Sequence, residues 1–252
     1  MTAGISCSMP RVPCSAQSVP VFRFKQFSVA QQSAAMKVNT DGVLLGAWAD
    51  VVDARRILDV GAGTGVIALM LAQRNVTANI DAVEIDERSA QQARENAQNS
   101  SWRRRITVYG QSFQSFAAQN AARYDLVVSN PPYFTNALLP PSETRKRTRH
   151  TEELPHEELL SGAKKILQPH GALCVVLPFT EGLAFIEQSA AHQLFCTRQT
   201  TVYGKTGKAP KRLLLHFSAM PAPIEKDTLV IHCGDGSYTP EYKALTGAFY
   251  LF

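Results

Sequence analysis

The sequence predicts an α/β fold built on one doubly wound, mainly parallel β-sheet. Short apolar stretches of strand length alternate with helical patterns along the chain. The early stretches are apolar without interruption, which is typical of parallel strands that are buried on both faces. A glycine-rich turn joins the first of these strands to the next helix. Such a sheet binds its ligands at the carboxyl ends of its strands.

The expected elements follow this alternation in order. A first helix is expected over residues 41–52, with Thr40 or Asp41 as its N-cap. The strands are expected at 56–60, 79–85, 106–109, 124–129 and 172–177, and as a pair at 197–203 and 212–218. The remaining helices are expected at 64–73, 87–99, 112–122, 157–167 and 181–191. We therefore expect a seven-stranded sheet with helices on both faces.

Length and composition fit one globular domain. The chain has 252 residues, of which 45% are hydrophobic and 19% charged, and no repeat period is visible. We expect a single domain over residues 21–252, preceded by a disordered tail at 1–20 that is rich in Ser, Pro and Ala. The formal net charge of +5 favours a polyanionic partner, because basic side chains ease the approach to phosphates.

The cysteines and the hydropathy pattern set the expected environment. No pair of cysteines is spaced as Cys-x-x-Cys and none has a histidine at ligand spacing, so we expect free thiols and no metal site. No apolar run approaches the ~18 residues that a membrane span needs. We expect a soluble, cytoplasmic protein. The five cysteines are Cys7, Cys14, Cys174, Cys196 and Cys233.

The glycine-rich turn is the first candidate for a binding site. It reads Asp-Val-Gly-Ala-Gly-Thr-Gly over residues 59–65, between a strand and a helix. Gly61 and Gly63 let the backbone approach a ligand, and the helix that follows offers unpaired N–H groups. Glu84 ends the next strand about 20 residues later, where a carboxylate can accept hydrogen bonds from two ribose hydroxyls.

Two details favour S-adenosylmethionine over a dinucleotide as the ligand. A dinucleotide site requires a third Gly or Ala three residues after the second glycine, and Val66 stands there. Asp59 ends the first strand and is well placed for the amino group of a methionine moiety.

The sequence Asn130-Pro131-Pro132-Tyr133 follows the expected strand at 124–129 and is the most specific feature of the chain. The Asn130 side-chain oxygen and the Pro131 carbonyl can both accept hydrogen bonds from an sp² amino group, which turns its lone pair toward a methyl donor. The prolines stiffen the loop. Tyr133 offers an aromatic face for a flipped base. The tetrapeptide therefore predicts methylation of an exocyclic or amide-type nitrogen.

Together these two motifs resemble the class I amino-methyltransferases, whose core is a Rossmann-like sheet. Three further stretches, at residues 24–27, 36–48 and 242–252, make the chain similar to the bacterial tRNA1(Val) adenine-N6 methyltransferases, which act on the adenine 3′ of the anticodon. The resemblance runs from about residue 22 to the last residue. It implies S-adenosylmethionine as cofactor, a tRNA substrate, and a cover over the cofactor formed by residues 37–46. The cofactor-binding residues expected are Lys37, Thr40, Asp41, Gly42, Asp59, Gly61, Gly63, Gly65, Glu84, Ile85, Ser112 and Asn130.

One position departs from the family pattern. Relatives usually carry an aspartate after the third strand, near the adenine amino group of the cofactor, and here Ser112 or Gln111 occupies that place. A serine oxygen still accepts a hydrogen bond, although a weaker one than a carboxylate does.

Three basic clusters are candidates for contact with RNA. The first follows the Asn-Pro-Pro-Tyr loop, and the others lie at residues 102–105 and 205–212. We expect the first to contact the substrate, and we expect a monomer. The alternative functions are those of a glutamine-N5 protein methyltransferase, of an rRNA or DNA adenine-N6 methyltransferase, and of a module that binds S-adenosylmethionine or RNA without enzymatic activity. The cations of the first cluster are Arg145, Lys146, Arg147 and Arg149.

Overall fold

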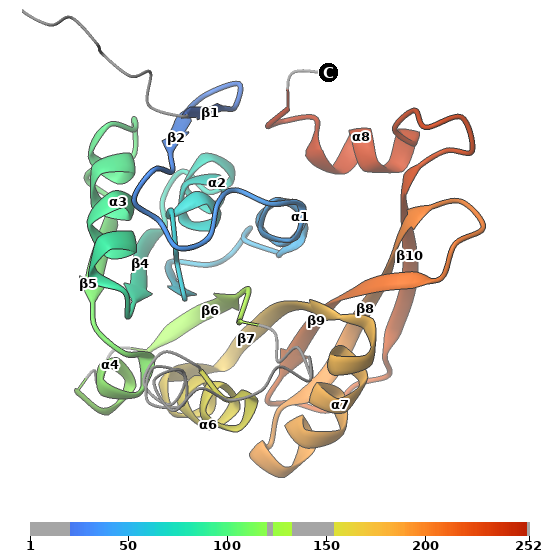
Figure 1. The fold of residues 1–252 in the computed structure, drawn as a ribbon. Helices are drawn as coiled ribbons and strands as arrows, with labels where there is room; N and C mark the ends of the chain where they lie inside the picture. Colours follow the sequence, from blue (N-terminus) through green and yellow to red (C-terminus); the bar gives the residue numbers. More distant parts are fainter. Residues whose placement is uncertain (1–20, 120–122, 133–153, 251–252) are drawn as a thin grey trace, which may run out of the picture.

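The structure is a computed structural model that describes residues 21–119, 123–132 and 154–250 (Figure 1). The predicted tail at 1–20 lies outside these residues. The central sheet has eight strands in the order β10-β8-β9-β7-β6-β3-β4-β5. The predicted α/β class with a mainly parallel sheet is confirmed, and the strand count exceeds the predicted seven by β10.

Five strands form the parallel part of the sheet, and their apolar runs are the reason for their burial. They are β3 (Arg56–Val60), β4 (Asn79–Glu84), β5 (Ile106–Gly110), β6 (Tyr124–Ser129) and β7 (Leu167–Pro178). Next to β7, β9 (Pro210–Ser218) is antiparallel and pairs with β8 (Phe195–Lys205), as predicted for this pair. The additional strand β10 (Glu225–His232) runs parallel to β8.

Helices cover both faces of the sheet (Figure 1). One face is covered by α1 (Thr40–Trp48), α2 (Val66–Arg74) and α3 (Glu87–Gln98), and α8 (Pro240–Thr246) packs beside α1 and β10. The other face is covered by α4 (Phe113–Gln119), α6 (His156–Ile166) and α7 (Phe179–Ser189), which is followed by a 3-10 turn at Ala190–His192. This distribution makes the sheet doubly wound.

The first helix differs from its prediction at both ends. Asn39 is the N-cap in place of Thr40 or Asp41, because its side-chain oxygen accepts a hydrogen bond from Gly42 N at 2.9 Å. The helix ends at Trp48 and not at residue 52. Trp48 Nε1 donates to Thr200 Oγ1 of β8 at 2.8 Å, so the end of the helix is fixed on the sheet.

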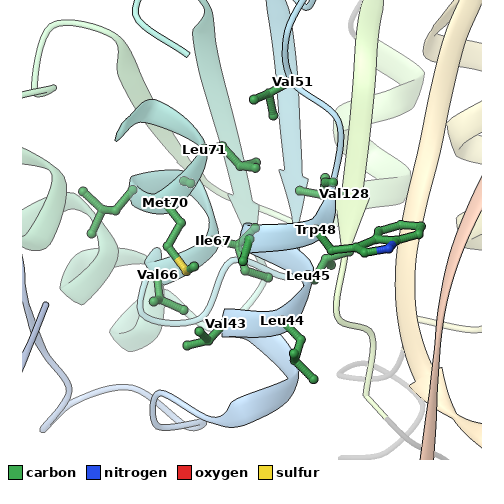
Figure 2. Close-up of a cluster of buried hydrophobic side chains, with 14 of the residues drawn as sticks. Val43, Leu44, Leu45, Trp48, Val51, Val66, Ile67, Met70, Leu71 and Val128 are labelled. Atoms are coloured by element: carbon green, nitrogen blue, oxygen red, sulfur yellow. The ribbon is translucent and has the colours of Figure 1, made fainter. Parts of the chain in front are cut away.

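Helix α1 is buried on all sides, as expected for an apolar helix between a sheet and other helices. Figure 2 shows its side chains against those of α2 and of the sheet. A Cβ atom at Gly46 would lie 2.8 Å from the sulfur of Met70, so the glycine permits the close approach of α1 to α2. This packing places the first turn of α1 beside the start of α2, at the carboxyl edge of the sheet.

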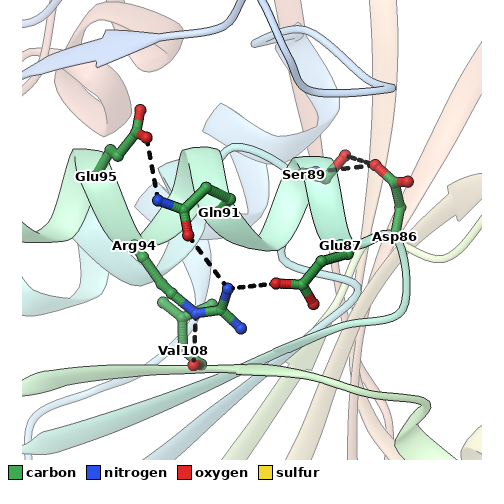
Figure 3. A network of polar contacts seen from close by, with 7 residues as sticks. All are labelled: Asp86, Glu87, Ser89, Gln91, Arg94, Glu95 and Val108. Atoms are coloured by element: carbon green, nitrogen blue, oxygen red, sulfur yellow. Dashed lines mark hydrogen bonds and ion pairs between the residues drawn. The ribbon is translucent and has the colours of Figure 1, made fainter.

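Helix α3 is fastened to the sheet and to the N-terminal segment by different faces. Toward the sheet, Arg94 Nε donates to Val108 O at 3.3 Å and Arg94 Nη1 donates to Glu87 Oε1 at 2.7 Å (Figure 3). Its other face buries Ser89, Gln92 and Asn96, which are polar residues spaced for one side of a helix.

These three polar side chains hold an N-terminal strap, residues 30–39, which the sequence did not predict. The strap follows a hairpin of β1 (Val21–Arg23) and β2 (Ser28–Ala30) and leads to α1 (Figure 1). Asn96 accepts from Ala30 N at 2.9 Å and donates to Ala30 O and Thr64 O at 2.8 and 2.9 Å. Ser89 Oγ accepts from Ala35 N at 3.0 Å. The polar face of α3 therefore replaces the strand partner that the strap backbone lacks.

We predict that Asn96→Ala lowers the free energy of unfolding by about 2–4 kcal/mol, because it removes the three hydrogen bonds of a buried side chain and leaves backbone groups unpaired. Denaturant unfolding monitored by circular dichroism measures the change. Gln98→Ala, on the exposed side of the same helix, is the control and should change stability by less than about 0.5 kcal/mol. Equal stability of the two variants would contradict the role assigned to Asn96.

Candidate functional site

The glycine loop between β3 and α2 forms the floor of a cavity. Gly61 and Gly63 have φ angles of +73° and +54°, and a Cβ atom on either would meet no protein atom within 4 Å. The N–H groups of Gly61 and Ala62 donate to Val83 O at 2.8 and 3.1 Å, which holds the loop against the end of β4. The loop therefore presents bare backbone to the cavity, in a conformation that other residues rarely adopt.

Glu84, the last residue of β4, holds both the glycine loop and the turn that leads from β4 to α3. Its Oε2 accepts from Gly63 N at 2.8 Å and its Oε1 accepts from Asp86 N at 2.9 Å. The side chain also lines the cavity, although only 9% of the residue is exposed. Each carboxylate oxygen has a further lone pair, so Glu84 can still accept hydrogen bonds from a ligand.

The cavity joins segments that are far apart in the sequence. Its walls come from the strap, the first turn of α1, the glycine loop, the end of β4, the turn after β5 and the residues after β6. Of the predicted cofactor residues, it brings together Lys37, Gly42, Gly61, Gly63, Glu84, Ile85, Ser112 and Asn130. Lining residues that the sequence did not single out include Ala35, Met36, Asn39, Ser89, Phe113 and Leu154.

Four predicted residues, Thr40, Asp41, Asp59 and Gly65, do not line this cavity. Thr40 is exposed at the start of α1. Asp41 Oδ2 forms an ion pair with Arg212 Nε at 2.7 Å. Gly65 has a φ angle of +76°, and a Cβ there would lie 3.3 Å from the Cβ of Ala93, so it lets α2 approach α3. These neighbours explain the residue types at Asp41 and Gly65 without a ligand.

Asp59 is fully buried at the end of β3, directly behind the glycine loop. Its Oδ2 accepts from Ala68 N in α2 at 3.1 Å, and Oδ1 has no hydrogen-bond partner among the described residues. Burial raises the pKa of Asp59 to about 7; the Ala68 hydrogen bond acts in the opposite direction and the nearby Glu84 carboxylate adds to the rise. Among the described residues, no cation lowers the pKa of this buried carboxyl group.

The tetrapeptide of the sequence lies at the carboxyl end of β6. Ser129 Oγ donates to Val60 O at 2.9 Å, so the end of β6 is fixed beside the end of β3. Asn130, Pro131 and Pro132 then line the cavity, and the strand that carries them is the neighbour of the strand that leads into the glycine loop. Tyr133 lies outside the described residues, as do all four cations of the first basic cluster, Arg145, Lys146, Arg147 and Arg149.

The turn after β5 contains both residues considered for the adenine of a cofactor. Ser112 Oγ accepts from Ser115 N at 3.2 Å and donates to Ser115 Oγ at 3.0 Å, so it caps α4. Gln111 also lines the cavity, and no hydrogen bond of its side chain to the described residues is found. Ile85 and Phe113 supply apolar surface on the same side of the cavity.

The cluster at residues 102–105 does not lie at this site. Arg105 precedes β5, and its carbonyl accepts from Ile80 N near the start of β4 at 2.7 Å, which places the cluster at the amino edge of the sheet. The Arg105 guanidinium donates to the carbonyls of Ala72, Asn75 and Ala78 at 2.7–2.9 Å. The expectation of an RNA-binding role for Arg105 is therefore replaced by a structural one at the end of α2.

The doubly wound sheet, the open glycine loop and the acidic end of the second parallel strand define a class I S-adenosylmethionine-dependent methyltransferase. The family model described as the methyltransferase small domain matches residues 39–189. Among solved structures, a predicted O-methyltransferase from Agrobacterium tumefaciens aligns with a TM-score of 0.66 at 20% identity, over 83% of this chain and 96% of that one. TrmN from Thermus thermophilus aligns with a TM-score of 0.50 at 20% identity, over 70% of this chain and 48% of that one.

Relatives of known name show to which family within this class the chain belongs. The chain is 44% identical over 246 residues to a tRNA1(Val) (adenine(37)-N6)-methyltransferase of Cronobacter sakazakii, covering 97% of this chain and 99% of the relative. It is 46% identical to the protein of that name in Trichodesmium erythraeum, covering 91% and 97%. The chain belongs to the tRNA1(Val) (adenine(37)-N6)-methyltransferase family.

Membrane-spanning helices and metal-binding clusters are absent from the described residues. No helix in 21–119, 123–132 or 154–250 is long and apolar enough to cross a membrane. In the same part of the chain, no three His, Cys, Asp or Glu side chains are grouped so that they could hold a metal ion. Cys174, Cys196 and Cys233 are free thiols.

We predict that Glu84→Gln weakens binding of S-adenosylmethionine by about 1–3 kcal/mol, because an amide cannot replace a carboxylate that serves two backbone N–H groups and a ligand. Isothermal titration calorimetry measures the affinity, and circular dichroism checks the fold. Glu87→Gln, an exposed carboxylate on the first turn of α3, is the control. Unchanged affinity in a folded Glu84→Gln variant would move the ribose contact elsewhere.

We predict that the stability of Asp59→Asn relative to wild type increases as the pH rises, because wild type loses stability. The folded pKa of Asp59, about 7, exceeds its ordinary value of 3.8, so the unfolded chain loses this proton first. The Asp59 contribution to wild-type stability should therefore fall between about pH 4 and pH 7 and stay level above pH 7. Urea unfolding at several pH values checks this; a difference between the two proteins that does not grow over this range would contradict it.

Proposed function

We propose that this protein transfers a methyl group from S-adenosylmethionine to N6 of the adenine at position 37 of tRNA1(Val). The observation that carries the proposal is the identity of 44–46%, over more than nine-tenths of the chain, to relatives that bear this activity in their names. The cavity supports it, because a cofactor-type glycine loop and the residues Asn130 and Pro131 line the same cavity.

The residues present fit the cofactor. Gly61 and Gly63 leave open space where a ligand can approach the backbone, Glu84 has acceptor capacity for ribose hydroxyls, and Gln111 or Ser112 can meet the adenine amino group. Ile85 and Phe113 offer apolar contact to the adenine ring. The bound cofactor supplies an electrophilic methyl group on a sulfonium sulfur. The lining by Lys37 and Gly42 supports the role of the strap and of the first turn of α1 as its cover.

Asn130 orients the nucleophile in this proposal. Its side-chain oxygen and the Pro131 carbonyl accept hydrogen bonds from the two N6 protons of adenine, which directs the nitrogen lone pair at the methyl carbon. When bound, the cofactor would supply the methyl group to this nitrogen, and the nitrogen would then release one proton to solvent. Pro131 and Pro132 keep the loop rigid. Tyr133 serves as the stacking surface for the base that is turned out of the RNA.

Several further assignments belong to the same proposal. Arg145, Lys146, Arg147 and Arg149 bind RNA phosphates next to the Asn-Pro-Pro-Tyr loop. Residues 21–252 act as one domain and as a monomer, and the protein works in the cytoplasm, where its tRNA substrate is. A glutamine-N5 protein methyltransferase is less well supported, because the curated relatives that share the whole chain are named for tRNA.

Methylation of purified tRNA tests the function. Unmodified tRNA1(Val) is incubated with the protein and S-adenosylmethionine, digested, and its nucleosides are measured by mass spectrometry. We expect N6-methyladenosine from this tRNA and none from a variant with guanine at position 37. Methylation of the guanine-37 variant, or of neither RNA, would contradict the proposal.

The same assay tests the role of Asn130. We expect Asn130→Ala to lower the single-turnover methylation rate about a hundredfold or more while affinity for S-adenosylmethionine stays nearly unchanged. Asn99→Ala, at an exposed position that follows α3, is the control. A rate within twofold of wild type would exclude Asn130 as an essential acceptor.

A further inference from the structure

A second basic surface lies at the end of the β8–β9 hairpin. We define the hairpin basic surface as Lys205, Lys208 and Lys211, with Arg212 at its base. The turn between the strands is closed by Lys208 N, which donates to Lys205 O at 3.2 Å, and by Gly207, with a φ angle of +74°. Thr206 N donates to His232 O at 3.1 Å, which fastens the hairpin to the end of β10.

Strand register places this surface at the same edge of the sheet as Asn130. Ser129 pairs with Val175 of β7, and three residues further along β7 Pro178 pairs with Arg212 of β9. At about 3.3 Å per residue and 4.8 Å per strand, Arg212 lies roughly 10 Å further out than Ser129 and roughly 10 Å across the sheet. The hairpin turn extends beyond Arg212, so it lies at the same edge of the sheet as the cavity residue Asn130.

Arg212 anchors the hairpin to the catalytic part of the molecule. Its ion pair with Asp41, at 2.7 Å, joins β9 to the first turn of α1, whose neighbours Asn39 and Gly42 line the cavity. The hairpin and the cavity are therefore held in a fixed relation by a half-buried pair. This gives Arg212 a positioning role and leaves the lysines as the cations that reach outward.

The three lysines keep their charge available. None of them forms an ion pair with a residue in the described part of the chain. Asp235 of the neighbouring turn interacts with Lys205, but its carboxylate is engaged by Ser237, which donates from N at 2.9 Å and from Oγ at 2.7 Å. The stem of Lys211 lies across Gly204, where a Cβ would meet its Cε at 3.2 Å. Three ammonium groups thus gather on one short hairpin, which is a pattern for phosphate contact.

We propose that the hairpin basic surface binds the phosphate backbone of the tRNA arm that carries the target adenine. The proposal rests on the proposed function and deepens it by assigning a substrate surface on the described part of the chain. Its contacts position the RNA and do not choose the base. The cluster at residues 102–105 lies at the opposite edge of the sheet, and so its cations can serve as controls that carry the same charge at a different place.

The test compares two triple variants with the same change in charge. One is Lys205→Gln, Lys208→Gln and Lys211→Gln; the control is Arg103→Gln, Arg104→Gln and Lys226→Gln, three exposed cations at the amino edge. Affinity for tRNA1(Val) is measured by fluorescence anisotropy over a series of salt concentrations. Calorimetry with S-adenosylmethionine alone checks that both variants retain the cofactor site.

We expect the hairpin variant to bind tRNA at least tenfold more weakly at low salt than the control does. The slope of log K against log salt should shrink by about 0.7–0.9 for each phosphate that the variant no longer neutralises. Affinity for S-adenosylmethionine should match wild type in both variants, and the control should bind tRNA within twofold of wild type. A hairpin variant with the same tRNA affinity and salt slope as the control would overturn the proposal.

Failure of the hairpin proposal can be distinguished from failure of the proposed function. If wild-type protein methylates tRNA1(Val) while the hairpin variant binds it like the control, the function stands and the hairpin assignment is wrong. If wild-type protein binds tRNA1(Val) no more tightly than a noncognate tRNA and methylates neither, the proposed function fails and the hairpin proposal fails with it.

Discussion

The carboxylate of Glu84 is the interaction on which the candidate site depends. It accepts from Gly63 and from Asp86, and so it joins the glycine loop to the start of α3. Asp86 Oδ2 in turn accepts from Ser89 Oγ at 2.6 Å, and Ser89 Oγ accepts from Ala35 N at 3.0 Å. One continuous series of hydrogen bonds therefore runs from the floor of the cavity to the strap, whose residues also line it. A change at Glu84 reaches the loop, the helix and the strap together.

The charges behind the cavity complement the ligand proposed for it. Asp59 and Glu84 are two carboxyl groups at the ends of adjacent strands, and burial together with Glu84 raises the pKa of Asp59. S-adenosylmethionine carries a sulfonium and an ammonium group, so the proposed ligand would itself bring positive charge to this region. A cationic ligand nearby favours the charged form of Asp59, whereas the negative charge of a dinucleotide's pyrophosphate would oppose it.

The sequence predicted the elements that are buried on both faces most accurately. The bounds of β3 and β6 agree with the prediction, because a short, largely apolar run between turn residues leaves few alternatives for a parallel strand. Strand β10 was missed, since its first four residues are exposed and polar and only its second half is buried. The strap was missed because its partners are side chains of α3, about 60 residues away. The N-terminal hairpin was missed because its strands have three residues each and it is fastened to the C-terminal end of the chain, where Lys25 N donates to Phe249 O at 2.8 Å.

The candidate site was predicted unevenly for a related reason. Residues that act through their backbone or at a strand end, such as Gly61, Glu84 and Asn130, were found from local motifs and line the cavity. Residues 102–105 directly precede a predicted parallel strand, which is enough to place them at the amino edge of the sheet, away from the ligand site. The edge at which residues 205–212 lie depends on the antiparallel direction of β9, which the sequence did not predict. Asp41 was expected beside the cofactor, and its partner is Arg212, which follows 171 residues later in the chain.

The way in which α3 holds the strap also bears on how this region can change in evolution. Asn96 and Ser89 bind main-chain groups of Ala30 and Ala35, which every residue type except proline can offer at the N–H positions. The contacts at these two anchor points therefore do not depend on the side chains of residues 30 and 35. Because Ala35 also lines the cavity, substitutions at this position offer a route by which selection can alter the cavity wall while the strap keeps its course.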